Sequence, residues 1–263
     1  MNKARGEIRI LLVEDNATNQ EVTLRTLEHL GCRNVEIAGD GREALAALAV
    51  RDFDLVLMDC HLPVMDGYDT CREIRNGASA VRNHQVPVVA LTAAVLESDR
   101  RKCFAVGMDG YIAKPLRLQA IEDAIQRFAI GAAAGIAPAS PPEASRAAKP
   151  AAFNSESFAG SVMGSRQLAR RIIRRFVDDM PRQIALLAQA VADADAPRVR
   201  LLAHSIKGAA ASVSGEEMRE TSWQLEQCGR DGDLSSAQNA IHDLSASFDR
   251  AREAMERFCE ADG

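Results

Sequence analysis

Apolar and polar residues alternate in two different ways along this chain, and the change falls near its middle. In the first half, runs of β-branched and aliphatic residues read as five strands: "IRILLVED", "NVEIAG", "DLVLMD", "VPVVALTA" and "GYIAKP". The segments between them repeat apolar residues at helical spacing. Because such alternation implies a parallel sheet covered on both faces, we predict an α/β, doubly wound, five-stranded parallel sheet over residues 7–128.

Local signals mark where helices of this half begin and end. The segment "TNQE" at residues 18–21 fits a capping box that opens the first helix. Gly31 is placed to close that helix, because glycine adopts the left-handed conformation easily. Asp40 precedes "GREALAALAV" and is predicted to cap this second helix.

From residue 153 onward the strand pattern stops and helical periodicity takes over. We predict helices near residues 165–179, 182–193, 197–212, 216–228 and 234–259. Pro181 is expected to kink or break the chain between the first two. Short connections between amphipathic helices predict an antiparallel, all-α bundle over residues 153–260. Residues 129–152 are almost all Ala, Pro, Gly and Ser, which is the composition of a linker.

Composition and charge narrow the classes of function. The 263 residues suffice for two domains with buried cores, and the formal net charge of −5 favours neither nucleic acid nor anionic membrane as a partner. No run reaches the roughly 20 apolar residues of a membrane span, and the first ten residues lack the apolar core of a signal peptide. Six cysteines without a CxxC pair indicate free thiols in a reducing cytoplasm.

Polar and charged residues stand at the ends of the predicted strands. The first strand ends in Glu14 and Asp15, the third in Asp59, the fourth in Thr92 and the fifth in Lys114. In an open parallel sheet these carboxyl ends meet in one crevice. Three carboxylates together favour a bound cation with oxygen ligands, such as Mg²⁺. A metal and a lysine would also neutralise a phosphoryl group on one carboxylate. The alternative is that these residues merely solubilise loop starts.

Residues 7–128 resemble the receiver domain of two-component response regulators. The motifs "VEDNATNQ", "LMDCHLPVMDGYD", "ALTA" and "YIAKP" match that family in order and spacing. The resemblance implies that Asp59 accepts a phosphoryl group. It also implies that Glu14, Asp15 and Asp59, with the backbone carbonyl of His61, hold Mg²⁺.

The same resemblance assigns further residues around the acceptor. Thr92 and Lys114 would contact the phosphoryl oxygens, and Tyr111 would be the aromatic side chain that reports the phosphorylation state. The Lys114–Pro115 peptide bond is expected to be cis. The sequence departs from the family at Glu14, where Asp is more frequent, and the longer side chain changes the metal geometry without removing an oxygen ligand.

In the second half, one histidine does not follow the apolar pattern of its helix. Val199, Leu202 and Ile206 recur at three- and four-residue steps, whereas His204 lies about 200° around the axis from Leu202. We therefore expect the His204 ring to be exposed, opposite the apolar stripe. Lys207, one turn on, is placed to balance a phosphate charge, and Gly208 keeps the surface low. The alternative is an ordinary solvated helix face.

The run "AHSIKGAAAS" resembles the signature of histidine phosphotransfer domains, which are all-helical, and "WQLEQCGRDGDL" resembles the helix and turn that follow it. The resemblance implies that His204 is phosphorylated on a ring nitrogen. It implies that Lys207 and Gly208 are supporting residues.

A receiver joined to a phosphotransfer bundle predicts a phosphorelay. Asp59 would take phosphate from an upstream histidine kinase, and His204 would pass it to a downstream response regulator receiver. The chain shows no P-loop or other glycine-rich nucleotide site, so it is not expected to use ATP itself. It resembles the C-terminal part of a hybrid sensor histidine kinase. We expect it in the cytoplasm, free or as the cytoplasmic end of a membrane-bound kinase, without membrane contact of its own.

Two other functions remain open at this stage. Phosphorylation of Asp59 could mainly regulate access to the bundle instead of feeding it. An aspartyl-phosphate hydrolase is the second alternative, but such enzymes usually carry an acid two residues after the nucleophile, where this chain has His61.

Overall fold

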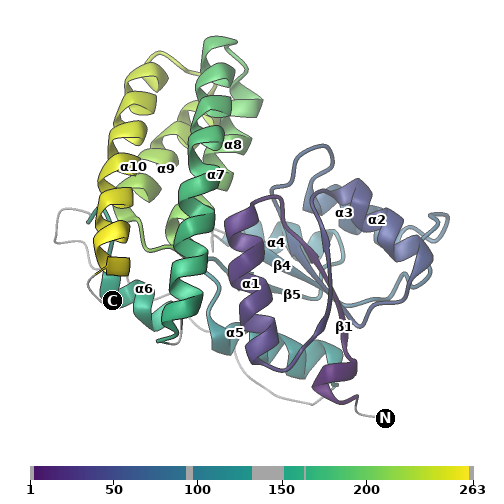
Figure 1. The fold of residues 1–263 in the computed structure, drawn as a ribbon. Helices are drawn as coiled ribbons and strands as arrows, with labels where there is room; N and C mark the ends of the chain where they lie inside the picture. The colour runs from purple at the N-terminus through teal and green to yellow at the C-terminus, as the bar shows by residue number, and fades with distance from the viewer. Residues whose placement is uncertain (1–2, 93–96, 132–150, 163, 261–263) are drawn as a thin grey trace. The chain divides into compact units, whose positions relative to one another are not determined.

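The computed structural model describes residues 3–92, 97–131, 151–162 and 164–260. The chain divides into two compact units, one built almost entirely from its first half and the other from its second half (Figure 1). Most of the predicted linker, residues 132–150, lies outside the described residues. The exact domain boundaries therefore stay a prediction.

The first unit is built on the predicted parallel sheet. Its strands are β1 (Arg9–Val13), β2 (Asn34–Ala38), β3 (Leu55–Asp59), β4 (Val88–Thr92) and β5 (Gly110–Ala113). All neighbouring strands pair in parallel, in the order β2-β1-β3-β4-β5. In this doubly wound fold the strand order reverses between β1 and β3, the point where open α/β sheets place their sites. The predicted α/β fold class is confirmed.

Helices cover both faces of this sheet. They are α1 (Ala17–His29), α2 (Gly41–Val50), α3 (Gly67–Arg75), α4 (Glu97–Ala105) and α5 (Leu118–Ala124). Alternate residues of β1 face opposite cores: Leu11 and Val13 belong to one buried cluster, Ile10 and Leu12 to the other. This two-residue period on a strand buried from both sides explains why its sequence reads as a continuous apolar run.

Two of the three predicted helix ends are confirmed. The Asp40 side chain accepts hydrogen bonds from the backbone N–H groups of Arg42 and Glu43. Gly31 closes α1 with φ of 84°, next to a bond from the Cys32 N–H to the Leu27 carbonyl.

The predicted capping box at residues 18–21 is wrong, because α1 begins earlier, at Ala17. The side-chain oxygen of Asn16 accepts hydrogen bonds from the N–H groups of Thr18 and Asn19, so Asn16 takes the capping place expected of Thr18. Asparagine caps as well as threonine does, and the start of the helix decides which of them is used.

The second unit is a helical bundle, as predicted. Its helices are α6 (Ser155–Ser161), α7 (Arg166–Ala192), α8 (Ala196–Ser212), α9 (Glu216–Asp231) and α10 (Ala237–Glu260). Helix α7 packs on α8, α8 on α9, α9 on α10 and α10 back on α7 (Figure 1), which closes a ring of four long helices around one core. Within the described residues, no helix is long and apolar enough to cross a membrane.

The predicted break at Pro181 is wrong, because α7 runs unbroken from Arg166 to Ala192 with Pro181 inside it. A proline removes one hydrogen bond from a helix interior and strains the preceding turn. Buried residues continue on both sides of it, from Phe176 and Met180 to Ile184 and Leu187. The burial of this continuous apolar face outweighs the local loss.

Candidate functional site

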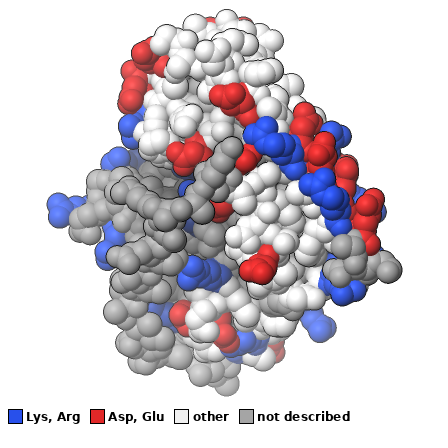
Figure 2. Space-filling view, turned by 90° about the vertical axis from the view of Figure 1, so that its left-hand side faces the viewer, with Lys and Arg blue, Asp and Glu red and all other residues white. Residues whose placement is uncertain are grey.

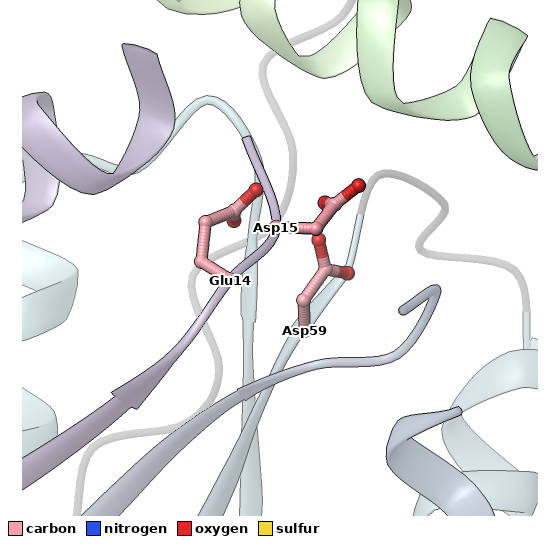
Figure 3. Close-up of side chains that lie close together, drawn as sticks. All are labelled: Glu14, Asp15 and Asp59. Atoms are coloured by element: carbon pink, nitrogen blue, oxygen red, sulfur yellow. The ribbon is translucent and has the colours of Figure 1, made fainter. Parts of the chain in front are cut away.

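The acidic strand ends meet at one edge of the sheet. Glu14 and Asp15 directly follow β1, and Asp59 is the last residue of β3. Because these adjacent strands are parallel, their carboxylates converge, and one oxygen from each lies within 4.8 Å of the others (Figure 3). The strand-end cluster is the arrangement expected from the sequence.

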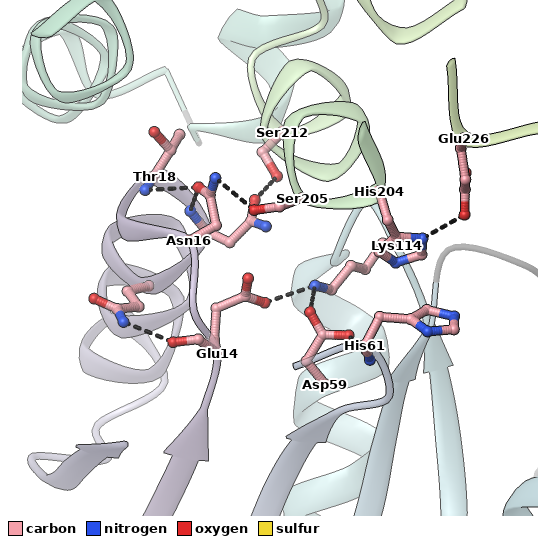
Figure 4. Close-up of polar contacts among 12 residues, drawn as sticks. Glu14, Asn16, Thr18, Asp59, His61, Lys114, His204, Ser205, Ser212 and Glu226 are labelled. Carbon is pink, nitrogen blue, oxygen red and sulfur yellow. Dashed lines mark hydrogen bonds and ion pairs between the residues drawn. The ribbon is translucent and has the colours of Figure 1, made fainter. Parts of the chain in front are cut away.

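Lys114, which follows β5, supplies the positive charge of this cluster. Its Nζ lies 2.6 Å from Glu14 Oε2 and 2.6 Å from Asp59 Oδ2 (Figure 4). All three side chains are buried, with at most 5% exposed. Burial alone would lower the pKa of Lys114, but the charges of Asp59 and Glu14 outweigh burial and raise it. Lys114 is therefore an ammonium group at neutral pH.

Asp15 is the member of the cluster without such a partner. Burial, together with the charges of Glu14 and Asp59, raises the pKa of its carboxyl to about 8. Among the described residues, none hydrogen-bonds its buried Oδ1. An unsatisfied carboxylate oxygen beside two further carboxylates fits a hard divalent cation, which would lower this pKa again.

The other predicted receiver residues lie on β4 and β5 or just after β3 and β5. Thr92 ends β4 and is buried. The His61 N–H donates to Asp59 Oδ1 at 3.1 Å, which orients the carboxylate. The Lys114–Pro115 bond is cis, as expected. Tyr111, on β5, stacks edge-on against the ring of Phe104, with centroids 6.4 Å apart.

In the bundle, His204 is held by a carboxylate that sequence reasoning missed. Its Nδ1 lies 2.7 Å from Oε1 of Glu226 on α9 (Figure 4). Lys207 pairs with the other oxygen of the same carboxylate. Burial would raise the pKa of Glu226, but His204 and Lys207 outweigh it and lower it to about 2. Because an ionised carboxylate only accepts, Nδ1 must carry a proton, so Nε2 is the ring nitrogen that a neutral imidazole would offer to a phosphoryl group.

The prediction of an exposed His204 ring did not include a partner from another helix, and Glu226 of α9 is such a partner. The sequence prediction considered α8 by itself, as a helix with one apolar stripe. In the structure α9 packs along α8, and Glu226 takes the Nδ1 edge of the ring. The interaction joins two helices, so periodicity along one of them could not reveal it.

A glycine allows α9 to come this close to α8. A Cβ added to Gly229 would lie 2.5 Å from the backbone nitrogen of Arg200 and 2.8 Å from the carbonyl oxygen of Ala196. Gly229 follows Glu226 by three residues, so it lies on the same side of α9. The close backbone contact therefore fixes the position from which Glu226 reaches His204.

Gly229→Ala is expected to destabilise the bundle by about 1–3 kcal/mol, because backbone must move to admit the methyl group. Urea unfolding followed by circular dichroism measures this loss. Gly160→Ala is the matched control, since a Cβ there meets nothing within 4 Å. Equal stability of the two variants would contradict the close approach of α9 to α8.

Comparisons with known proteins identify a family for each half of the chain. Residues 10–126 match the family described as response regulator receiver domain, and residues 171–254 match the Hpt domain. The virulence sensor protein BvgS of Bordetella bronchiseptica is 30% identical over 231 residues, which cover 86% of this chain and 18% of that protein. The sensor histidine kinase AruS of Pseudomonas aeruginosa is 34% identical over 208 residues, 78% of this chain and 19% of that protein.

Solved structures match the first half. The receiver domain of the sensor histidine kinase PA1611 from Pseudomonas aeruginosa, with a magnesium ion in its active-site cleft, is 42% identical. That match covers 48% of this chain and 98% of that domain, with a TM-score of 0.43. The chain spans about a fifth of the length of the curated relatives named above. This chain thus belongs to two-component signalling: it is a response regulator receiver domain followed by an Hpt domain, and its relatives are hybrid histidine kinases.

Proposed function

We propose that Asp59 and His204 are successive phosphoryl acceptors in a phosphorelay. An upstream histidine kinase donates to Asp59, and His204 passes the group to an aspartate of a downstream response regulator. The strongest support for this proposal is the position of the Lys114 ammonium, 2.6 Å from both Asp59 and Glu14. It provides fixed positive charge where the phosphoryl group would arrive.

At Asp59 a carboxylate oxygen attacks the phosphorus of the donor phosphohistidine. The new O–P bond forms as the N–P bond breaks, and the electron pair of that bond leaves with the donor imidazole. Lys114 and Thr92 would hold the phosphoryl oxygens, while the His61 N–H keeps the carboxylate in place. The protein supplies alignment and charge, which is the general mode of phosphoryl-transfer catalysis.

At His204 the lone pair of Nε2 attacks the phosphorus of the acyl phosphate. The bond between phosphorus and the Asp59 oxygen breaks, and its electron pair returns to the Asp59 carboxylate. The product ring carries a proton on Nδ1 and phosphorus on Nε2, and it is therefore cationic. Glu226, bonded to Nδ1, neutralises that charge, and Lys207 balances the phosphate. Gly208 is proposed to leave room for the partner.

Glu226→Gln is expected to lower the rate of phosphoryl transfer to His204 by 10- to 100-fold, because the neutral amide no longer stabilises the cationic ring. The pH dependence of stability should change as well. The low pKa of Glu226 adds stability that is complete above about 4.5 and is lost as the pH falls toward about 2.

Rapid-quench labelling and acid unfolding measure the two effects. Glu220→Gln, on the same helix, is the control and should change neither. Wild-type transfer rates in Glu226→Gln would contradict the role given to this carboxylate.

We propose Mg²⁺ as the cofactor, held by the carboxylates of Glu14, Asp15 and Asp59 and by the carbonyl of His61. The raised pKa of Asp15 and its unsatisfied oxygen support this set. When bound, the ion would neutralise charge on the phosphoryl group. Tyr111 is proposed to report that charge through its ring position.

Mg²⁺ is expected to raise the free energy of unfolding of the receiver by about 2.7 kcal/mol at a hundredfold excess over its dissociation constant. Thermal unfolding with and without EDTA measures this gain. In Asp15→Asn most of the gain should vanish, whereas Asp52→Asn, an exposed carboxylate paired with Arg82, should keep it. An equal gain in all three chains would contradict the proposed ligands.

The chemical stability of the label tests the function directly. Wild type is incubated with a phosphorylated donor kinase, and the label is mapped by acid and alkali stability and by mass spectrometry. We expect alkali-labile label on Asp59 and acid-labile, alkali-stable label on His204. Label on Asp59 alone would favour the alternative, in which receiver phosphorylation regulates access to the bundle. Steady release of phosphate from small phosphoesters would favour a hydrolase.

A further inference from the structure

Val64 combines two unfavourable features in the loop between β3 and α3. Its backbone has φ of 64°, in the left-handed region that β-branched residues rarely adopt, and its side chain is 75% exposed. Asn or Gly would relieve the strain, and a polar side chain would suit the exposure. The fold itself gains nothing from valine at this position. The gain must therefore come from something outside the receiver.

The loop that carries Val64 is fixed at both ends beside Asp59. The Gly67 N–H donates to the Cys60 carbonyl at 3.1 Å, and a Cβ on Gly67 would lie 2.2 Å from the Asp59 carbonyl oxygen. Farther along the loop, the Met65 carbonyl accepts from the Gly41 N–H at 3.3 Å. The strained conformation is thus built into the receiver.

Val64 lies close enough to Asp59 to be covered by whatever protein delivers or removes its phosphate. Val64 stands only three positions before Gly67, whose backbone lies against the Asp59 carbonyl, so the Val64 Cα is at most about 10 Å from that of Gly67. A standard interface of about 800 Å² per partner is a patch of roughly 16 Å radius. A histidine that reaches Asp59 therefore brings its own domain over Val64.

The bundle offers a matching apolar group beside its histidine. Trp223, in α9, is 46% exposed and is the one exposed large apolar side chain recorded among the described residues of the bundle. It precedes Glu226 by three residues, which places the two as neighbours on the helix surface. Glu226 in turn is bonded to His204. Tryptophan is also the residue type most enriched at binding hot spots.

We propose that Val64 is a docking residue of the receiver for the His204-bearing face of the bundle, and that its strain is retained for this contact. The inference rests on the proposed exchange of phosphate between Asp59 and His204. Burial of Val64 against that face during transfer gives the binding energy that the isolated receiver does not gain.

Transfer between two full chains tests the inference. The donor is the Asp59→Asn chain, labelled on His204 with phosphoramidate. The acceptor is the His204→Gln chain, with Val64 intact or changed to Asn. Direct labelling of each acceptor with phosphoramidate, a small donor that needs no docking, is measured alongside. Val50→Asn is the matched control, because this 68% exposed valine ends α2, at the edge of the sheet opposite Asp59.

Val64→Asn is expected to lower kcat/KM for transfer from the donor chain roughly tenfold, through KM, as for one buried valine lost from an interface. Direct labelling by phosphoramidate should stay within twofold, and the melting temperature should rise by a few degrees as the strain is relieved. Val50→Asn should change neither transfer nor labelling.

Equal transfer to the Val64→Asn and intact acceptors would overturn the inference alone. So would an equal fall in labelling by phosphoramidate, because Val64 would then act on the acceptor site itself. If phosphoramidate labels the intact acceptor but the donor chain does not, the proposed exchange between Asp59 and His204 fails, and the inference fails with it.

Discussion

Asp59→Asn is expected to abolish kinase-dependent label on Asp59 and, with it, label on His204. The amide lacks the nucleophilic carboxylate oxygen, so no acyl phosphate forms. Because His204 is proposed to draw its phosphate from Asp59, it should receive none from the kinase. The loss should be complete, which makes this the largest effect expected of any substitution. Quantified acid-labile and alkali-labile label, after incubation with the phosphorylated kinase, measures it.

Asp52→Asn is the control for this substitution, since Asp52 is exposed and pairs with Arg82 at the surface. It should label as wild type does. If the Asp59→Asn chain still acquires His204 label from the kinase at the wild-type rate, the relay order is wrong. The receiver would then regulate a bundle that the kinase serves directly.

Lys114→Met is expected to slow phosphorylation of Asp59 by about 10²–10³-fold, the usual loss when one preorganised charge at a reacting group is removed. Methionine keeps most of the length of the side chain, but it leaves Glu14 and Asp59 without the ammonium 2.6 Å from each. In Mg²⁺-free buffer the buried carboxylates should also destabilise the receiver, by about 3–5 kcal/mol. Initial labelling rates and urea unfolding measure the two effects.

Lys102→Met, on the exposed side of α4, carries the same substitution away from the crevice and should behave as wild type. Added Mg²⁺ should recover part of the stability lost in Lys114→Met, because a cation again lies among the carboxylates. A wild-type labelling rate in Lys114→Met would show that its contacts with Asp59 and Glu14 serve folding alone.

The receiver site could be predicted from the sequence because its geometry follows from topology. Parallel strands put their carboxyl ends at one edge of the sheet, so Glu14, Asp59 and Lys114 had to meet once the strands were recognised. The site in the bundle depends on register between two helices, which periodicity along one helix does not contain. Glu226 was therefore missed.

The errors at Pro181 and at Thr18 have different causes. Pro181 is an interior helix breaker by sequence, but α7 buries one apolar face along its whole length. Thr18 is a good cap, yet Asn16 stands two residues earlier and bonds the first turn.

Along one edge of the surface in Figure 2, acidic and basic side chains alternate, so charge there marks no single binding face.

The order in which the label reaches the two acceptors tests the central claim most directly. In a single-turnover, rapid-quench experiment, wild type is mixed with an excess of labelled kinase and sampled over time. We predict alkali-labile label on Asp59 first, then its decline as acid-labile label grows on His204, at a rate independent of chain concentration because the two domains are tethered. Label that appears on His204 without a lag, before any label on Asp59, would contradict the relay.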